Sequence, residues 1–305
     1  MSSTLSRLDG ARPVPPGGWR GTLFDYYEIT KPRIIYLLLI TTFAAMMMAA
    51  HGIPPLGLTL ATLCGGALAA GSAGAFNCVI DRDIDRLMTR TMTRPIATGR
   101  ISPHAGALFA LLLGIVSFAI LFRLVNPLAA WLSLAGNAYY VIIYTLWLKR
   151  TTTLNIVIGG AAGAVPPLVG WAAVAHNVGG PALGLFALIF LWTPPHFWAL
   201  ALMANTDYHK ANVPMLPNVR GARRTKIEIF VYSVVLVAVS LALTPLHVMG
   251  LWYFIPAAIL GGIFLWDAWR MLSGPTKPLA RILFKYSLLY LGLMCVAMVI
   301  DRVIR

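Results

Sequence analysis

The chain is poor in charge and in cysteine. Only 11% of its 305 residues are Asp, Glu, Lys or Arg, and only ten are acidic, whereas charged residues make up about a quarter of a soluble domain. This composition argues against a soluble globular protein. The three cysteines are scattered and form neither a CxxC nor a CxxCH motif, which argues against a disulfide framework, a zinc site and covalently attached haem.

Long apolar runs take the place of charge. Hydrophobic residues make up 59% of the chain, its mean hydropathy is +0.77, and the alternation typical of a membrane β-barrel is missing. A helix needs about 20 apolar residues to cross a bilayer. We therefore predict an all-α polytopic membrane protein with nine transmembrane helices, near residues 34–52, 57–80, 104–122, 127–147, 154–174, 181–203, 228–246, 251–271 and 284–301.

The basic residues predict how the chain is oriented in the membrane. If the N-terminus is cytoplasmic, all but three of the 24 Lys and Arg residues fall on the cytoplasmic side; the exceptions are Arg123, Arg302 and Arg305. Because Lys and Arg concentrate in cytoplasmic loops, this bias predicts a cytoplasmic N-terminus and a C-terminus outside. The net charge of +14 then reflects membrane orientation, and no nucleic-acid partner is expected.

The N-terminal segment predicts neither a signal peptide nor a transit peptide. Residues 1–21 contain no apolar core of the kind that a secretory signal needs, and the stretch PVPPGG interrupts any amphipathic pattern. We expect a disordered cytoplasmic tail over residues 1–27 and a single transmembrane domain over residues 28–305. Because this tail is short, a bacterial cytoplasmic (inner) membrane is favoured over the mitochondrial inner membrane.

Three polar side chains stand out where the second apolar run ends. Asn77, Asp81 and Asp85 are spaced four residues apart, so at about 100° per residue they follow one face of a helix. Ionisable groups within a membrane protein are read as functional, and hard oxygen ligands suit Mg²⁺, which binds one or two carboxylates together with substrate phosphates. We predict that this acidic stripe (Asn77, Asp81 and Asp85) is catalytic and holds the metal, whereas Asp83 points off it towards an ion-pair partner.

Basic residues around the acidic stripe predict a site for a diphosphate. Guanidinium and ammonium groups can bind the phosphate oxygens that a metal ion leaves free. The alternative is that the arginines only mark the cytoplasmic side and pair with the aspartates, and that the other cations anchor the chain at the lipid headgroups. The candidate substrate-binding residues here are Lys31, Arg33, Arg82, Arg86, Arg94, Tyr144, Lys149 and Arg150.

A second polar group follows the Pro194–Pro195 pair near the end of the sixth apolar run. Asp207 is a fourth candidate catalytic residue, which would complete the metal–diphosphate site from the opposite side, with Lys210 as a phosphate contact. His196 is a candidate substrate-binding residue at membrane depth. Its imidazole can ligate haem iron, accept a proton or form a hydrogen bond in the core, and the sequence leaves these three roles open.

Glycines are concentrated in the second and fifth apolar runs. Small residues let membrane helices approach one another closely, so we expect tight packing there. Slim helices also leave room for a bulky ligand. The glycines concerned are Gly65, Gly66, Gly71 and Gly74 in the second run, and Gly159, Gly160 and Gly163 in the fifth.

The acidic stripe resembles the first aspartate-rich motif of the UbiA superfamily of intramembrane prenyltransferases. Four longer segments narrow this resemblance to the haem-farnesylating branch, the protoheme IX farnesyltransferases. They are TKPRI, NCVIDRDIDRLMTRTMTRP, LKRTTTLNIVIGGAAGAVPPLVGWAA and PPHFWALALMANTDYHKANVPMLP, which together span residues 30–217. The first motif alone is typical of the whole superfamily, whereas the four together are specific.

The resemblance implies a fold, a reaction and a set of partners. Nine helices would surround a central cavity that opens towards the lipid bilayer. The loops after the second and sixth spans, residues 81–103 and 204–227, carry the two acidic motifs and would cap the cytoplasmic end of the cavity; we call them the first and second motif loops. Farnesyl diphosphate would ionise with the help of Mg²⁺, and the farnesyl cation would alkylate a vinyl group of haem B. Water would then supply the hydroxyl group of haem O, a cofactor of terminal oxidases. A haem A synthase is a candidate partner.

The resemblance also assigns residues. Asn77, Asp81 and Asp85 match the metal–diphosphate motif, and Asp207 matches the second acidic motif, although Ala211 stands where quinone-type members carry another aspartate. Aromatic faces can stabilise a carbocation by about 0.5–2 kcal/mol each. The candidates for this role are Phe76, Tyr139, Tyr140, Tyr144 and Trp198.

Three other functions compete with haem farnesylation. A prenyltransferase could act on an aromatic quinone precursor, although His196 and the VPMLP stretch argue against it. Nine spans with buried charges would also suit a haem or lipid transporter, but the acidic stripe lies at one membrane face and not at the midplane. The last alternative is a haem-binding assembly factor that catalyses no reaction.

Overall fold

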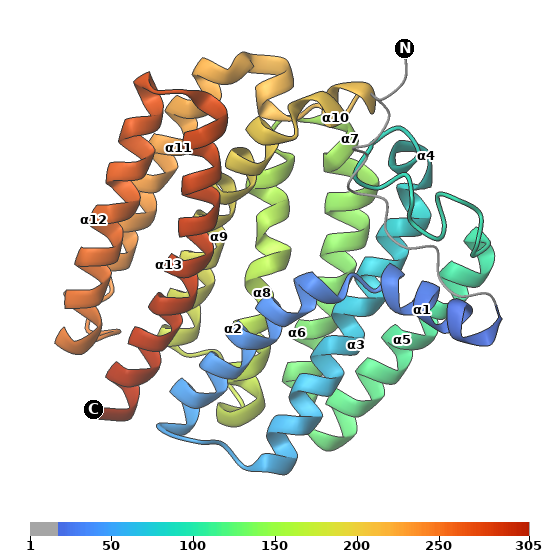
Figure 1. Ribbon diagram of the computed structural model, residues 1–305. Coiled ribbons are helices and arrows are strands. Elements are labelled where there is room, and N and C mark those ends of the chain that lie inside the picture. Colours follow the sequence, from blue (N-terminus) through green and yellow to red (C-terminus); the bar gives the residue numbers. More distant parts are fainter. Residues whose placement is uncertain (1–17, 305) are drawn as a thin grey trace.

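The computed structural model describes residues 18–304, whose regular elements are all helices, without a β-strand (Figure 1). Among them, nine helical segments are long and apolar enough to cross a membrane, which confirms the predicted all-α class and the number of spans. They are α2 (Pro32–Ala50), α3 (Leu56–Ile80), α5 (Pro103–Leu124), Pro127–Thr151, α8 (Asn155–Ala175), α9 (Gly180–Met203), α11 (Leu216–Ala242), α12 (Leu251–Ser273) and α13 (Thr276–Ile304).

The fourth span changes its helical type along its length. It consists of α6 (Pro127–Ala138), the π-helix η1 (Tyr139–Leu148) and the short α7 (Lys149–Thr151). In η1 the hydroxyl of Thr145 donates to the carbonyl of Tyr140, five residues earlier. Long π-helical stretches are rare and occur mostly at functional sites, and η1 lies next to the acidic stripe.

The nine spans form a ring in chain order. Each span packs against the next, and α13 closes the ring against α2. Further contacts of α2 with α8 and of α9 with α13 narrow the interior. Figure 1 shows α11, α12 and α13 on one side of the bundle and α3 and α5 on the other, with α4 (Arg82–Asp85) and α10 (Asn205–Lys210) together at one end. We call this the motif end.

Proline and short polar residues define where the helices begin. The side chains of Ser102 and Asn126 accept hydrogen bonds from backbone amides three residues later, at 3.2 and 2.9 Å. In both cases the next residue is a proline (Pro103 or Pro127), whose missing N–H costs nothing in the first turn. These caps fix where α5 and α6 begin, and only two residues connect the end of α5 to the start of α6.

The sequence misjudged two boundaries. Residues 1–17 of the predicted disordered tail lie outside the described residues, but Trp19–Ile29 forms helix α1, so this part of the tail is helical. The predicted loop 204–227 contains α10 and the beginning of α11, which starts at Leu216 and kinks at Gly221 (φ 76°). A hydropathy window finds only the part of a helix that crosses the membrane, whereas the helix itself continues into polar sequence.

Glycines, which have no side chain, allow the tightest contacts between helices, as the glycine pattern predicts. A Cβ atom on Gly170 of α8 would lie 2.1 Å from the backbone oxygen of Thr42 on α2. One on Gly65 of α3 would lie 2.7 Å from the side chain of Leu121 on α5. These helices therefore pack backbone against backbone or against a large side chain, and only glycine fits.

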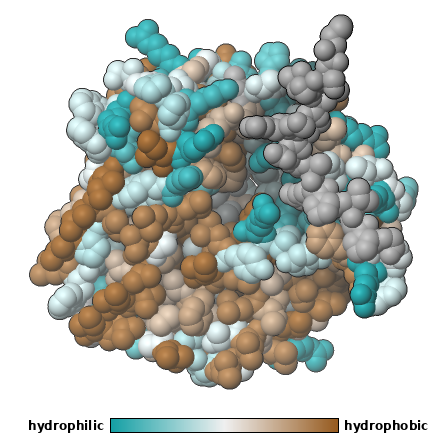
Figure 2. Space-filling view, in the orientation of Figure 1, coloured by the Kyte–Doolittle hydropathy of each residue, from teal (hydrophilic) through white to brown (hydrophobic). Residues whose placement is uncertain are grey.

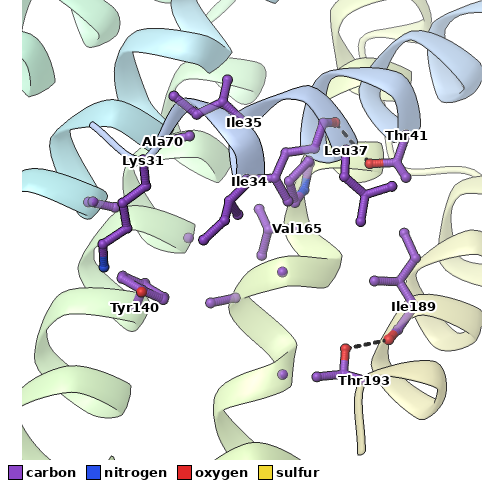
Figure 3. Close-up of a pocket in the computed structure, with 18 of the residues that line it drawn as sticks. Lys31, Ile34, Ile35, Leu37, Thr41, Ala70, Tyr140, Val165, Ile189 and Thr193 are labelled. Atoms are coloured by element: carbon purple, nitrogen blue, oxygen red, sulfur yellow. Dashed lines mark hydrogen bonds between the residues drawn. The ribbon is translucent and has the colours of Figure 1, made fainter. Parts of the chain in front are cut away.

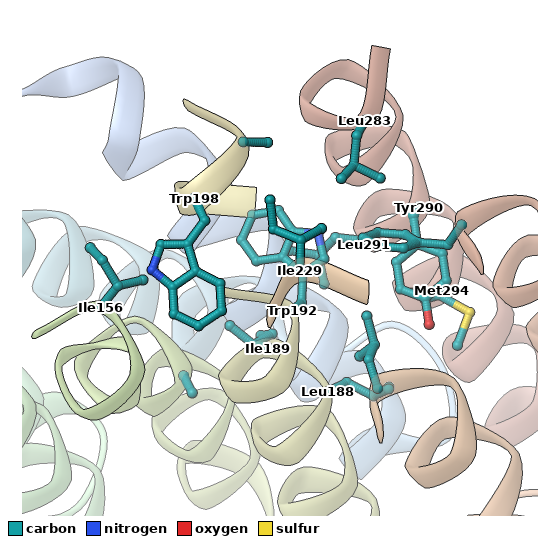
Figure 4. Close-up of a cluster of buried hydrophobic side chains, with 14 of the residues drawn as sticks. Ile156, Leu188, Ile189, Trp192, Trp198, Ile229, Leu283, Tyr290, Leu291 and Met294 are labelled. Carbon is teal, nitrogen blue, oxygen red and sulfur yellow. The ribbon is translucent and has the colours of Figure 1, made fainter. Parts of the chain in front are cut away.

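The surface has an apolar belt and a polar motif end (Figure 2). Large apolar side chains such as Ile115, Trp131 and Ile259 are more than half exposed. A soluble monomer rarely exposes a continuous apolar area of this kind, whereas lipid covers it in a membrane. Inside, the largest apolar cluster lies between α9, α11, α12 and α13, around Trp198, Ile229, Tyr290 and Met294 (Figure 4). The chain is an integral membrane protein.

Candidate functional site

The acidic stripe is buried at the motif end of α3. Asn77, Asp81 and Asp85 have exposed fractions of 2%, 0% and 1%. The backbone amides of Asp81 and Asp85 donate to the carbonyls of Asn77 and Asp81, at 2.9 and 2.8 Å. The helical ladder thus runs on from α3 into α4, and the three residues follow one face as their spacing predicts. The Asn77 side-chain amide also donates to Asp81 Oδ2 at 2.8 Å.

Each member of the stripe has its own cationic partner. Lys31 donates to Asn77 Oδ1, and Lys149 forms an ion pair with Asp81. Arg94 Nη1 donates to both carboxylate oxygens of Asp85, at 2.9 and 2.7 Å. Buried charges are stable only when they are paired in this way. Three of the predicted diphosphate-binding cations therefore converge on the stripe from three different segments.

A glycine brings Lys31 to the stripe. A Cβ atom on Gly74 would lie 2.7 Å from the carbonyl oxygen of Thr30, so only glycine lets the turn between α1 and α2 rest on α3. Lys31 has a left-handed backbone (φ 59°, ψ 57°) at the start of α2, and such strain is common at functional sites. Burial lowers the pKa of Lys31, while the nearby Asp81 and Asp85 act in the opposite direction.

Asp81 retains one oxygen that can accept a ligand. Its Oδ1 atom is buried and accepts no hydrogen bond, and its nearest cation is Arg150 Nη2 at 3.7 Å. Within residues 18–304 no three His, Cys, Asp or Glu side chains are close enough to hold a metal ion by themselves. The oxygen donors of the stripe are two carboxylates and one amide. They therefore fit a Mg²⁺ ion that takes its remaining ligands from a substrate or from water.

A cavity of about 520 Å³ lies inside the ring, next to the stripe (Figure 3). Its wall is mostly apolar and comes from α2, α3, α6, η1, α8, α9 and α13. The stripe residues lie behind this wall, and Lys31, Tyr140 and Tyr144 line its polar end. Figure 3 shows Lys31 above Tyr140 on one side, and Ile189 and Thr193 of α9 on the other. The cavity can hold an apolar chain whose charged head reaches Lys31.

Glycines of α8 shape the cavity wall. A Cβ atom on Gly159 would lie 2.2 Å from Cδ2 of Tyr144, so glycine is required for that ring to lie against α8. Gly163 also lines the cavity, but a Cβ atom there would meet nothing within 4 Å. Gly159 therefore positions an aromatic ring, and Gly163 leaves space. Of the five predicted aromatic residues, Tyr140 and Tyr144 line the cavity.

His196 is buried in the cavity wall on α9. Its ring stacks on Trp192 at 4.2 Å and on Phe284 at 4.5 Å between centroids, and its Nδ1 atom lies 2.7 Å from Ser287 Oγ. The hydrogen bond confirms that this imidazole is a partner in core packing. The same ring faces the cavity, so the structure is compatible with the other two predicted roles as well.

Asp207 contacts the first motif loop and makes no contact with the stripe in the described structure. Its two carboxylate oxygens accept hydrogen bonds from the backbone amides of Thr89 and Arg90, both at 3.3 Å. The Arg90 guanidinium donates to the hydroxyl of Tyr208 at 3.3 Å and lies over its ring. Asp207 and Tyr208 on α10 thus latch the two motif loops together. Lys210 is exposed on the same helix.

The remaining predicted cations are spread over the motif end. Arg82 and Arg86 donate to the backbone carbonyls of Val79 and Ala97, so both support the fold of the loop. Arg33 is exposed at the edge of the cavity. Arg150 forms two hydrogen bonds of 2.7 Å with Asp83, which confirms the predicted ion pair. These bonds lower the pKa of Asp83 to about 2.

Sequence reasoning missed two hydroxyl groups near the site. The Asn77 amide donates to the hydroxyl of Thr145 at 3.1 Å, and Ser287 bonds to His196. Asn155, at the start of α8, is 1% exposed, and neither atom of its side-chain amide has a hydrogen-bond partner. A single hydroxyl in an apolar helix carries little signal by itself, because its role depends on which distant residue it meets.

The comparison with known families identifies the family to which this fold belongs. Residues 38–291 match the model of the UbiA prenyltransferase family. The chain therefore belongs to this family and is a membrane-embedded prenyltransferase.

Within the family, the chain is similar to proteins named protoheme IX farnesyltransferase. One from Gloeobacter violaceus is 57% identical over 305 residues, covering 99% of this chain and 98% of the relative. Another from Synechocystis sp. is 54% identical over 279 residues, covering 91% and 88% of the two chains. The shared length includes both motif loops and all nine spans of the described structure.

Solved structures share the fold at low sequence identity. One, described as a digeranylgeranylglyceryl phosphate synthase, has a TM-score of 0.76 at 18% identity, covering 93% of this chain and 99% of the other. A UbiA homologue from Archaeoglobus fulgidus, described as bound to DMAPP and Mg²⁺, has a TM-score of 0.65 at 16% identity and covers 90% and 99%. These likenesses establish the ring of helices.

Proposed function

We propose that this protein transfers a farnesyl group from farnesyl diphosphate to a vinyl group of haem B, with hydration, and so makes haem O. The main support is the 57% identity to a protoheme IX farnesyltransferase over 99% of the chain. The arrangement of the site agrees with this assignment: a buried group of oxygen ligands and cations adjoins an apolar cavity. A charged head and a long apolar tail are the two ends of farnesyl diphosphate.

The acidic stripe and its cations are proposed to hold the diphosphate. Asn77, Asp81 and Asp85 fit a Mg²⁺ ion, which, when bound, would stabilise the negative charge that develops on the departing diphosphate. Lys31, Lys149 and Arg94 now pair with the stripe, and their ammonium and guanidinium groups are the nearest donors for diphosphate oxygens. Arg33 at the cavity edge and Arg150 beside Asp81 are further candidate donors, as is the exposed Lys210.

The apolar cavity is proposed to protect the farnesyl cation. Breaking the bond to diphosphate leaves an allylic cation, which water would trap if it could enter. The rings of Tyr140 and Tyr144 lie 5.3 Å apart between centroids, tilted by 35°, between the polar end and the apolar wall. Their rings can stabilise the cation by about 0.5–2 kcal/mol each. His196, deeper in the same wall, is proposed to contact haem B.

The orientation follows from the basic residues. The motif end is proposed to face the cytoplasm of a bacterium, and residues 28–305 are proposed to be one catalytic domain in the cytoplasmic membrane. This orientation agrees with the concentration of Lys and Arg at the motif end. A haem A synthase that accepts haem O is a candidate partner.

One reaction tests the function directly. Purified full-length protein is incubated with haem B, farnesyl diphosphate and Mg²⁺, and the products are analysed by mass spectrometry. We expect haem O to form. No haem O should form when a chelator removes Mg²⁺, and formation should return when Mg²⁺ is added back. A parallel reaction contains a hydroxybenzoate in place of haem B. Prenylation of the hydroxybenzoate but not of haem B, or no prenylated product in either reaction, would refute the proposal.

A further inference from the structure

The hydroxyl of Ser287 on α13 is the hydrogen-bond partner of His196 Nδ1. Ser287 Oγ lies 2.8 Å from the carbonyl oxygen of Phe284, to which it can donate, and 2.7 Å from His196 Nδ1. A hydroxyl group has one proton to donate. When that proton goes to the Phe284 carbonyl, the Ser287 oxygen accepts from a protonated Nδ1, and Nε2 keeps its lone pair.

The aromatic residues around His196 leave one edge of its ring towards the cavity. Trp192 and Phe284 cover the two faces, with interplanar angles of 18° and 23°. Trp192 is itself held in place, because its indole N–H donates to the backbone oxygen of Ser287 at 2.7 Å. With both faces covered and Nδ1 bonded to Ser287, Nε2 is the ring nitrogen that remains for a ligand, and the residue itself borders the cavity. His196 lies one turn beyond Thr193, which Figure 3 shows beside the cavity.

We propose that Ser287 is a positioning residue, which holds His196 in the Nδ1-protonated form and so presents the Nε2 lone pair to the iron of the haem substrate. This inference rests on the proposed function. An imidazole that ligates a metal through one nitrogen commonly donates its other N–H to a nearby acceptor, which sets its tautomer and orientation. Ser287 supplies that acceptor from a helix 91 residues away in the sequence.

A haem titration of the full-length protein, without farnesyl diphosphate, tests this role. The absorption spectrum of haem B reports a nitrogen ligand on the iron, and its change gives the affinity. We expect Ser287→Ala to weaken haem binding about 10- to 100-fold, the usual effect of removing such a partner, and to move the spectrum towards that of His196→Ala. The affinity for farnesyl diphosphate should change by less than about twofold.

Two further variants separate positioning from packing. Ser287→Thr keeps the hydroxyl group, so the haem spectrum of this variant should match that of the wild type. Ser233→Ala is the matched control, because Ser233 is also a fully buried serine in a span whose hydroxyl donates to its own helix, at 2.6 Å. It lies outside the cavity wall, so its loss should leave haem binding unchanged.

The tautomer can also be measured without a mutation at Ser287. Nitrogen-15 NMR of histidine-labelled protein distinguishes the protonated from the bare ring nitrogen, and His196→Gln identifies the signal. A proton on Nε2 would overturn the inference, as would wild-type haem spectra in both Ser287→Ala and His196→Ala. If those spectra are unchanged while haem O is still formed, only this inference fails. Haem binding through His196 without any prenylation would instead remove the proposed function.

Discussion

At the scale of single residues, the acidic stripe is notable for how it is paired. An amide and two carboxylates, each no more than 2% exposed, lie within a little over two turns of helix. Such a group folds only if cations reach it, and Lys31, Lys149 and Arg94 do. The same cations are suited to bind a diphosphate. The pairing therefore stabilises the site with groups that are also suited to bind the substrate.

Removal of one negative charge from the stripe should stop the reaction without preventing membrane insertion. Asp81→Asn keeps the size of the side chain but weakens both the proposed metal site and the pair with Lys149. We expect haem O formation to fall by at least about 100-fold, measured by mass spectrometry on protein purified from membranes.

Asp83→Asn is the control for this change. Asp83 lies two residues away, but its side chain is 60% exposed and pairs with Arg150 off the stripe. It should retain most of the activity. Near wild-type turnover in Asp81→Asn would contradict the assignment of the metal site.

At the scale of helices and loops, α8 shows how one element uses glycine for two purposes. Gly170 allows backbone contact with α2, and Gly163 faces the open cavity. Both are glycines in the same helix, and only their tertiary surroundings distinguish them. The π-helix η1 is another such element, because it brings Thr145 to the stripe and Tyr144 to the cavity.

An added methyl group should lower the stability of the protein at Gly170 but not at Gly163. Gly170→Ala would place its Cβ atom 2.1 Å from the Thr42 oxygen, and such overpacking typically costs about 1–3 kcal/mol. We expect a lower melting temperature for the purified protein. Gly163→Ala, with open space around it, should melt like the wild type, and a fall in stability there as large as that of Gly170→Ala would show that close packing is not the cause.

The latch between the motif loops offers a test of what Asp207 does. Asp207→Asn replaces an acceptor for two backbone amides by a group with only one acceptor oxygen. We expect faster tryptic cleavage after Arg90, which Thr91 follows, monitored by gel electrophoresis and mass spectrometry.

The Mg²⁺ concentration that gives half-maximal activity separates the two roles of Asp207. If this residue only holds the loop, that concentration should stay the same while cleavage accelerates. If Asp207 is a metal ligand, as the second acidic motif suggests, the Mg²⁺ requirement should rise. Unchanged cleavage would show that the latch contributes nothing to loop order.

At the scale of the whole molecule, charge and shape agree on one orientation. The cations that surround the stripe all lie at the motif end, and the cavity begins there and extends between apolar spans. A charged diphosphate would therefore enter from one side of the membrane, and apolar portions of the substrates from within it.

Thiol labelling in intact cells should detect this orientation. In a variant without the native cysteines, Lys210→Cys at the motif end should react with a membrane-impermeant reagent only after the cells are opened. Leu246→Cys, in an exposed turn between α11 and α12, should react in intact cells. The reverse pattern would contradict a cytoplasmic motif end.

The sequence alone determined the features that depend on near neighbours. The nine spans follow from apolar runs of membrane length, and the stripe follows from a spacing of four residues within one helix. Composition failed where helix forms in polar sequence, as in α1 from Trp19 and in the part of α11 that begins at Leu216.

Tertiary structure decided which distant groups meet. Lys31 and Lys149 come from 46 and 68 residues away to reach Asn77 and Asp81, and Ser287 comes from 91 residues away to reach His196. No local pattern encodes such pairs, because they depend on how the ring closes and on the close helix approaches that glycines permit. The same long-range packing leaves the cavity open beside the stripe, and this juxtaposition is what a prenyl transfer requires.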